Sequence, residues 1–296
     1  MPEPFVLLNG SYVPASAARV SVLDRGFLYG DAIFSTMRTY GGRLAHFPDH
    51  FRRMSGNLES LGIEISWNSA DLLGQINELL RLNGLKDADA IVRVQVSRGV
   101  GDKLGLKDKV RATPTVFALA YAIDAETLSR RGKGVSLASV PGLHAGGAAR
   151  LKIAFYAKNL LCARIAKTQG ADDGVFIDGE GRVAEASTAN IFFIQDGRAF
   201  TPSLDVGALP GITRAHILAL CKANSIPAEE GAYAAARFQE ADEVFLTASV
   251  SEIVPVSEFD KKPVRYFGER PVTRRLHRLY DELTAKSLSP KGDFPK

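Results

Sequence analysis

The order of apolar and polar residues in this chain predicts short β-hairpins separated by amphipathic helices. Asn9-Gly10 lies between two apolar runs in VLLNGSYV, a pattern that is typical of a two-residue hairpin turn. Because turns this short cannot join parallel strands, we expect largely antiparallel or mixed sheets. Three more hairpin turns are predicted, at Gly41-Gly42, at 179–181 and at Asp196-Gly197.

Helical periodicity follows the strands. Pro48 has the position of a first-turn proline, and apolar residues follow it at intervals of three and four. A second helix is capped by Asn68 or Ser69 and ends at Asn83-Gly84. Three further helices are expected, from about Phe155 to Gln169, from Thr213 and from Pro271.

This order of elements predicts an α+β fold with two domains. Strands, two helices and strands precede a looser stretch, and a second set of strands and helices follows it. The 296 residues are ample for two hydrophobic cores. We expect a smaller domain at 1–123, a linker at 124–131, a larger domain at 132–286 and a flexible tail at 287–296.

Composition and charge exclude several function classes. Hydrophobic residues make up 46% and charged residues 24%, as in ordinary globular proteins. The net charge of +4 comes without a run of basic residues, so no nucleic-acid partner is expected. No stretch has the ~18 apolar residues of a membrane span, and no secretory signal is evident, so we expect a cytoplasmic protein without a membrane partner. Cys162 and Cys221 lie among apolar residues and are expected to be buried free thiols.

Motifs for metal or dinucleotide binding are missing from the sequence. The five histidines show no ligand spacing with a carboxylate or cysteine, so no metal is expected. A site for a single phosphate is indicated at LPGITR, where Gly211, Ile212 and Thr213 open a helix and direct backbone N–H groups outward. On this fragment alone, an ordinary Thr-capped helix is the more frequent explanation.

Two further side chains have the chemistry of a catalytic site. Lys152 lies in ARLKIAFYAKNLL among apolar neighbours, and burial lowers the pKa of a lysine, which suits Schiff-base formation. Lys158 is the alternative, and a surface lysine is the more common outcome for either residue taken alone. Glu185 ends one strand of a predicted hairpin, where an exposed glutamate is usual.

Taken together, these fragments resemble the class IV aminotransferases, which include branched-chain aminotransferases, D-amino-acid aminotransferases and aminodeoxychorismate lyases. Five blocks occur in the order and at the spacing of that family, with departures at Ala32, Ser35 and Phe155. The resemblance implies a two-domain fold type IV enzyme with mixed and antiparallel sheets, a homodimer and the cofactor pyridoxal 5′-phosphate (PLP). The blocks are DRGFLYGDAIFSTMR, HFRRMSGNLESLGI, the lysine segment, VAEASTANIFF, and LPGITR with LTASVSEI.

The resemblance also implies a role for each candidate residue. Lys152 would carry the cofactor as a Schiff base and then move the proton of the substrate. Glu185 would contact the pyridine nitrogen, Tyr156 the phenolic oxygen and Arg53 the phosphate. Leu209 would pack on the cofactor ring. Further phosphate contacts would come from Ile212, Thr213, Ala248 and Ser249.

Substrate recognition follows less directly from the resemblance. Tyr29 and Phe34 match pocket aromatics of branched-chain enzymes, whereas Thr36 matches the lyase. Arg98 matches an arginine close to the substrate, but Val100 replaces the histidine of the D-amino-acid enzymes. The implied activity moves an amino group between a branched-chain-like or D-amino acid and a 2-oxo acid. An aminodeoxychorismate lyase and a non-catalytic PLP-binding protein are the alternatives.

Overall fold

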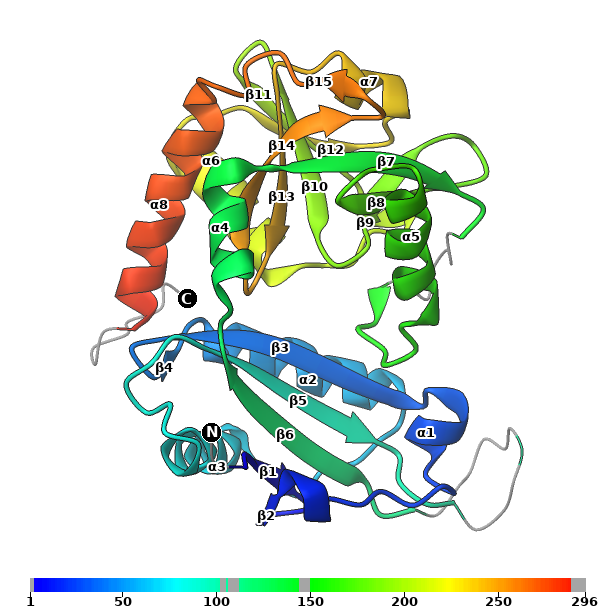
Figure 1. The fold of residues 1–296 in the computed structure, drawn as a ribbon, viewed down its shortest axis with the longest axis vertical. Helices are drawn as coiled ribbons and strands as arrows, with labels where there is room; N and C mark the ends of the chain where they lie inside the picture. Colours follow the sequence, from blue (N-terminus) through cyan, green and yellow to red (C-terminus); the bar gives the residue numbers. More distant parts are fainter. Residues whose placement is uncertain (1–2, 102–104, 106–111, 144–149, 289–296) are drawn as a thin grey trace. The chain divides into compact units, whose positions relative to one another are not determined.

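The chain divides into two units, each with its own sheet and hydrophobic core (Figure 1). The computed structural model describes residues 3–101, 105, 112–143 and 150–288. The first unit comprises residues 1–123, 151–155 and 287–296, and the second comprises residues 124–150 and 156–286. No helix in the described ranges is long and apolar enough to cross a membrane.

The first unit contains a six-stranded antiparallel sheet in the order β2-β1-β6-β5-β3-β4. The predicted hairpin at Asn9-Gly10 is confirmed, because both residues have the positive φ of a type I′ turn, 49° and 83°. The strands are β1 (Phe5–Leu8), β2 (Ser11–Pro14), β3 (Ala32–Tyr40), β4 (Arg43–Leu44), β5 (Ala90–Ser97) and β6 (Thr115–Ala122).

Two long helices cover one face of this sheet. Val92, Val94 and Val96 alternate along β5 and are buried in the core that these helices complete. Asn68 caps the second of the two helices in a reciprocal capping box with Asp71, as predicted. The helices of this unit are α1 (Arg25–Tyr29), α2 (Phe47–Ser60) and α3 (Ser69–Leu82), with a short 3₁₀ turn at Ala15–Ala17.

The opposite face of the sheet carries aromatic and polar side chains. The register pairs Phe34 with Gln95 and Thr36 with Arg93, and directly opposed residues of antiparallel strands lie on the same face. Alternation along β5 places Arg93 and Gln95 on the face away from the buried valines. This face therefore has a composition suited to binding rather than to a core.

The second unit contains a nine-stranded mixed sheet in the order β12-β11-β10-β13-β14-β7-β8-β9, with β15 paired to β14. The pairs β11–β12, β14–β7 and β7–β8 are parallel and the others are antiparallel, which confirms a mixed α+β architecture. The strands are β7 (Val135–Pro141), β8 (Asp173–Ile177), β9 (Val183–Ala186), β10 (Asn190–Gln195), β11 (Arg198–Pro202), β12 (Ala228–Gly231), β13 (Glu243–Ala248), β14 (Glu252–Phe259) and β15 (Lys262–Pro263).

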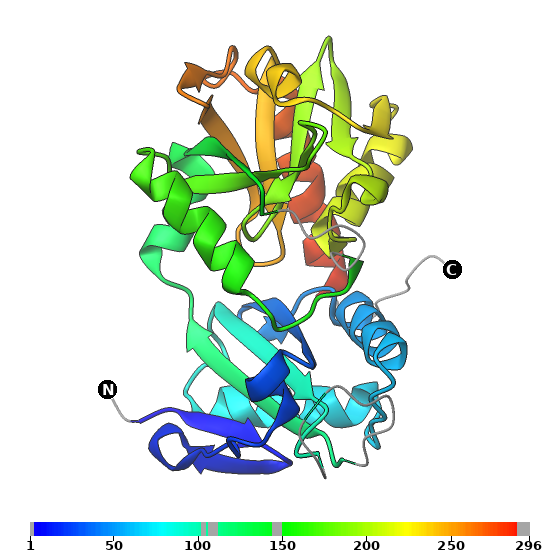
Figure 2. The same ribbon diagram turned by 90° about the vertical axis from the view of Figure 1, so that its right-hand side faces the viewer.

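Both faces of this second sheet are buried. Phe192 and Phe193 are neighbours on β10, yet Phe192 stacks on Phe245 at 5.0 Å between ring centroids and Phe193 on Phe200 at 4.8 Å. Helices α6 and α8 complete the core on the Phe192 side, while α5 packs against β7 and β8 (Figure 2). The helices are α4 (Ala125–Lys133), α5 (Ala157–Thr168), α6 (Ile212–Ala223), α7 (Ala235–Gln239) and α8 (Pro271–Ser287), with a 3₁₀ turn at Leu204–Val206.

Cys162 and Cys221 are buried and free, which confirms the sequence-based prediction. Burial raises the pKa of Cys162 to about 12 and that of Cys221 to about 11. Because the thiolate is the reactive form of cysteine, neither side chain has the character of a nucleophile.

The observed division differs from the predicted domain boundaries in two places. Residues 124–131 were expected as a linker, but residues 125–131 belong to α4, and the Asp124 carboxylate caps its first turn by accepting the N–H of Thr127. Residues 151–155, expected in the larger domain, belong to the first unit. Of the flexible tail predicted at 287–296, Ser287 is instead the last residue of α8, and residues 289–296 lie outside the described residues.

The second difference has a simple physical cause. The segment around Lys152 is extended and pairs with β3, where Phe34 donates its N–H to the carbonyl of Lys152 at 3.0 Å. Ala154 in turn donates to the carbonyl of Ala32 at 2.8 Å. Backbone polar groups need partners, and this segment finds them on a strand far away in the sequence, which local sequence patterns do not reveal.

Candidate functional site

Lys152 lies beside an aromatic ring on the face of the first sheet that the helices do not cover. Its Nζ is 4.7 Å from the ring centroid of Phe34, and the guanidinium carbon of Arg93 lies 3.7 Å from the same centroid. Pairing with β3 fixes the backbone of Lys152 at this position. The structure therefore places an amine, an aromatic ring and a guanidinium together.

Arg53, the predicted phosphate ligand, lies on α2 one turn after His50. The Nδ1 of His50 is 2.8 Å from the Oγ of Ser35, and both side chains are buried. Burial is the largest cause that lowers the pKa of His50 well below its ordinary value, and the positive charges of Arg53, His46 and Lys152 lower it further, outweighing Asp49. His50 is therefore neutral near pH 7. Sequence reasoning missed His50 and Ser35, although Ser35 marks one of the departures from the family pattern.

Glu185 lies on β9 of the second unit and is held in a fixed orientation. Its Oε2 accepts hydrogen bonds from the Leu209 N–H at 2.9 Å and from the Asn190 side-chain amide at 3.2 Å. The same amide donates to the carbonyl of Leu209 at 2.8 Å. Asn190 thus joins the carboxylate to the turn before α6, a link that the sequence analysis did not assign to it.

The N-terminus of α6 is suited to an anion. Gly211 is the N-cap residue, and no side chain of the described chain caps this helix, so the Thr-capped interpretation is wrong. Ile212 and Thr213 form the first turn, where backbone N–H groups lack intrahelical partners and the helix dipole is positive. A Cβ on Gly211 would lie 2.0 Å from the Oδ1 of Asn190, so only glycine fits beside the amide that orients Glu185.

The turn between β13 and β14 carries the remaining predicted phosphate contacts. Ala248 ends β13, and Ser249 follows it in the turn; both are partly exposed. Next to them, the Oγ1 of Thr247 is buried and has no hydrogen-bond partner among the described residues. A buried hydroxyl of this kind is explained by a ligand or solvent that supplies the partner.

The predicted substrate residues all belong to the first unit. Phe34 lies beside Lys152, and Thr36 faces Arg93 across β3 and β5. Tyr29 lies on α1, where its Oη accepts the N–H of Gly105 at 3.0 Å.

Arg98, the remaining predicted substrate residue, forms hydrogen bonds with other residues of the first unit. It contacts both carboxylate oxygens of Asp31, at 2.7 and 3.2 Å, and the carbonyls of Leu61 and Gly62 at 2.6 and 3.0 Å. Burial alone would raise the pKa of Asp31, but hydrogen bonds from Arg98 and Arg25 outweigh it and lower the pKa. Contact between Arg98 and substrate stays a prediction.

The class IV amino-transferase family model matches residues 32–259, and the chain belongs to that family. It is 32% identical over 288 residues to an aminodeoxychorismate lyase of Bacillus subtilis (strain 168), covering 97% of each chain. It is 26% identical to a D-alanine aminotransferase of Staphylococcus aureus (strain MSSA476), covering 94% of this chain and 96% of the other.

The fold is also that of solved members. A branched-chain amino acid aminotransferase from T.th., complexed with N-(5′-phosphopyridoxyl)-L-glutamate, superposes with a TM-score of 0.86 at 27% identity, covering 99% of this chain and 97% of the other. The protein is a PLP-dependent transaminase of fold type IV.

The side chains present fit PLP. Lys152 offers the amine, Glu185 an oriented carboxylate, and α6 an N-terminus without a side-chain cap. The buried hydroxyl of Thr247, beside the β13–β14 turn, offers a further polar group. When bound, PLP supplies an electron sink that stabilises negative charge at the substrate Cα.

Proposed function

We propose that this enzyme moves an amino group between a small amino acid and a 2-oxo acid, with Lys152 as the residue that carries PLP. The position of the Lys152 amine, 4.7 Å from the Phe34 ring centroid on the face of the first sheet opposite α2 and α3, carries this proposal. Lys158, the alternative, lies on α5 with its Nζ 5.3 Å from the Phe176 ring centroid, in the other unit.

The roles of the other residues follow from their chemistry. We propose that Lys152 would hold PLP as a Schiff base and that its amine would serve as the general acid–base group for the proton of the substrate Cα. Glu185, oriented by two donors, would lie at the pyridine nitrogen of PLP, where a carboxylate would favour the protonated ring. Tyr156, the N-cap residue of α5, would donate to the phenolic oxygen, and Leu209 would pack on the ring.

The phosphate would be bound by charge and by oriented dipoles. Arg53 supplies a guanidinium, and the first turn of α6 supplies N–H groups from Ile212 and Thr213. Ala248 and Ser249 would contribute from the β13–β14 turn.

Arg93 is a candidate for the substrate carboxylate that the sequence analysis missed. Its guanidinium lies over the Phe34 ring at 3.7 Å, and its Nη2 donates to the Oε1 of Gln95 at 2.8 Å. A planar guanidinium that is held on two sides can bind a carboxylate through two parallel hydrogen bonds. We propose that Arg93 and Thr36 face the substrate, while Arg98 and Tyr29 act near them.

Reduction with borohydride tests the assignment of the lysine. Wild-type protein should be yellow, and borohydride should fix a phosphopyridoxyl group on the peptide that contains Lys152, as read by mass spectrometry. Lys152→Ala should retain weak PLP binding and lose turnover, while the matched Lys158→Ala should keep both. An adduct on Lys158, or full turnover in Lys152→Ala, would contradict the proposal.

An aminodeoxychorismate lyase is the second candidate, favoured by the 32% identity to the Bacillus subtilis enzyme over 97% of both chains. A screen of single L- and D-amino acids separates the candidates, because a transaminase substrate removes the visible absorption band of bound PLP. Release of pyruvate from aminodeoxychorismate without a 2-oxo acid acceptor would identify the lyase. A band that no substrate changes would identify a non-catalytic PLP-binding protein.

We also propose that the protein is a homodimer. Residues 20–29 of the first unit expose apolar side chains, with Phe27 at 73%, Val22 at 69% and Leu23 at 51% exposure. Exposed apolar patches of this kind commonly meet a partner, and a two-fold dimer is the usual arrangement. A cytoplasmic location stays a prediction.

A further inference from the structure

Glu252 occupies a backbone position that normally belongs to glycine. It is paired with Ala248 across a three-residue turn at 249–251, and its φ is +58°. Turns of this length place a residue in the left-handed region, where a side chain is strained. Glu252 is nevertheless only 1% exposed, so its carboxylate is buried as well. A strained backbone and a buried carboxylate both cost stability, which indicates that the Glu252 side chain has a role beyond the turn.

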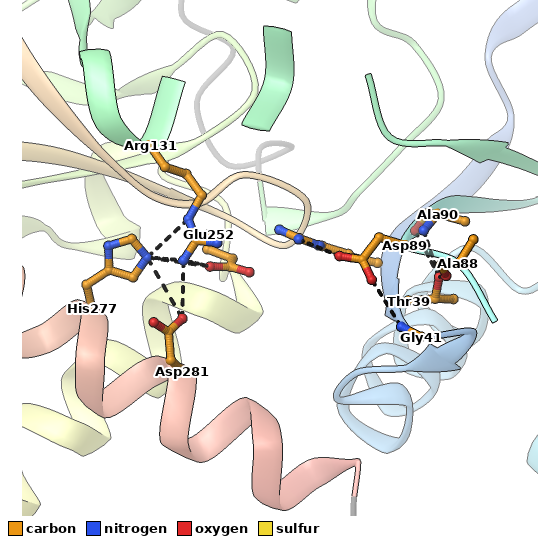
Figure 3. A network of polar contacts seen from close by, with 10 residues as sticks. Thr39, Gly41, Ala88, Asp89, Ala90, Arg131, Glu252, His277 and Asp281 are labelled. Atoms are coloured by element: carbon orange, nitrogen blue, oxygen red, sulfur yellow. Dashed lines mark hydrogen bonds and ion pairs between the residues drawn. The ribbon is translucent and has the colours of Figure 1, made fainter. Parts of the chain in front are cut away.

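The carboxylate of Glu252 is the centre of a charged network (Figure 3). It forms an ion pair with Arg131 of α4, and its Oε2 is 3.5 Å from the Nε2 of His277 on α8. The Nε of Arg131 donates to the same histidine nitrogen at 3.1 Å, and its Nη2 donates to Asp281 at 3.2 Å. One carboxylate thereby joins a turn of the sheet to two separate helices.

A metal ion is a poor explanation for this cluster. The ligand atoms of Glu252, His277 and Asp281 lie within 4.8 Å of one another, as metal ligands can. The guanidinium of Arg131 already lies among them and balances the buried negative charge. Arg131 therefore occupies the place among these side chains that a metal cation would take.

Helix α8, which carries His277, also contacts α6, whose first turn belongs to the proposed phosphate site. Tyr280, one turn after His277 on α8, has its Oη 3.4 Å from the Oγ1 of Thr213 in the first turn of α6. Helix α8 thus contacts Thr213 through Tyr280 and the end of the β13–β14 turn through His277.

We propose that Glu252 is a positioning residue for the PLP phosphate. Through its ion pair with Arg131, which also donates to His277 of α8, it holds the turn that carries Ala248 and Ser249 in register with the N-terminus of α6. The inference rests on the proposed assignment of the phosphate site. Glu252 does not contact the cofactor in this proposal; it sets the place of the backbone that does.

Substitution of Glu252 by glycine separates this role from turn geometry. Glycine adopts φ +58° without strain, so Glu252→Gly should keep a folded protein. The dissociation constant for PLP should nevertheless rise about tenfold or more, the order expected when one charged hydrogen-bond network is lost. The ³¹P resonance of bound PLP should also shift, because it reports the surroundings of the phosphate. Glu252→Gln, which keeps the size and removes the charge, should change both quantities in the same direction.

Glu243 provides the matched control. It is also a buried glutamate on this hairpin that contacts α8, accepting the N–H groups of Val272 and Thr273 at 3.0 and 2.8 Å. It lies at the other end of β13 from the turn. Glu243→Gln should lower the melting temperature but leave the PLP dissociation constant and the ³¹P resonance unchanged.

Two outcomes would overturn the inference: wild-type PLP affinity and ³¹P signal in Glu252→Gly, or an equal loss of affinity in Glu243→Gln. If the Glu252 variants do not fold, Arg131→Gln decides, because the Arg131 side chain is 24% exposed and tolerates change better. Weakened PLP binding in that variant supports the role, and wild-type binding refutes it. Failure of the wild-type protein to bind PLP on Lys152 would instead refute the proposed function.

Discussion

At the scale of single residues, the site depends on neighbours that fix the state of each functional group. Glu185 is oriented by Leu209 and Asn190, and His50 is kept neutral by burial beside Arg53 and Lys152. Neither environment follows from the residue type alone. Both make predictions that a single substitution can test.

Glu185→Gln should lower kcat by on the order of 100-fold, comparable to the loss of one preorganised electrostatic contact. In the proposed role, the substitution removes the negative charge beside the pyridine nitrogen but keeps the shape of the side chain, so PLP affinity should change little. Steady-state kinetics and PLP titration measure the two effects separately. Glu180→Gln, at a 72% exposed side chain in the turn of the same hairpin, should leave kcat as it is. Unchanged kcat in Glu185→Gln would show that this carboxylate is only a strand-end residue.

The depressed pKa of His50 predicts a dependence of stability on pH. His50 stays neutral in the fold and becomes charged in the unfolded chain below about pH 6.5, so the unfolded state binds the extra proton. The free energy of unfolding should therefore fall as the pH drops from about 7 to about 5, by at most about 1.4 kcal/mol per pH unit from this group. Urea unfolding at several pH values should show a shallower fall in His50→Gln. Equal slopes for the two proteins would mean that His50 is protonated in the fold.

At the scale of elements, the start of α6 is the clearest example of local sequence serving a site. Gly211 caps the helix without a side chain, and Asn190 from β10 lies against it. The amide of Asn190 then joins that turn to Glu185 on β9. Strand, turn and helix start thus form one connected structure around the proposed cofactor.

Gly211→Ala should disturb this structure, because the new Cβ would lie 2.0 Å from the Oδ1 of Asn190. We expect a loss of about 1–3 kcal/mol in the free energy of unfolding and weaker PLP binding. Gly74→Ala is the control: this glycine lies inside α3 with nothing within 4 Å of its added Cβ. The free energy of unfolding of Gly74→Ala should rise by about 0.5–1 kcal/mol, because alanine has a better helix propensity than glycine. Thermal unfolding with and without PLP measures the stability and the PLP binding of each variant. A change of stability in the same direction for Gly211→Ala and Gly74→Ala would contradict the prediction.

At the scale of the whole molecule, the residues for which we propose roles are found in both units. Lys152, Phe34 and Arg53 belong to the first unit, while Glu185 and Thr213 belong to the second. Each unit buries a hydrophobic core that is formed by its own residues. The exposed apolar side chains of residues 20–29 remain outside these cores.

Those side chains predict the oligomeric state. Light scattering should give the mass of a dimer, and Phe27→Asp should shift it toward the monomer because a charge cannot be buried cheaply in an apolar interface. Activity should fall together with the dimer on dilution. Leu128→Ser, at a 40% exposed leucine of the second unit, should leave the mass unchanged. A fully active wild-type monomer would contradict the proposal.

The sequence by itself determined the local features of this protein. The positive φ preference of Asn9-Gly10, the capping box of Asn68 and the alternation along β5 are set by neighbouring residues, and they were predictable for that reason. The family was predictable too, because five sequence blocks occur in its order and at its spacing.

Only the tertiary structure decided which distant groups meet. The segment of Lys152 pairs with β3, and Arg98 is held by Asp31 and by carbonyls at the end of α2, contacts that no local pattern encodes. The left-handed backbone of Glu252 also depends on a tertiary contact, because its carboxylate forms an ion pair with a cation on α4. Local propensity acts over a few residues, whereas these contacts depend on loop closure and on the need of every buried polar group for a partner.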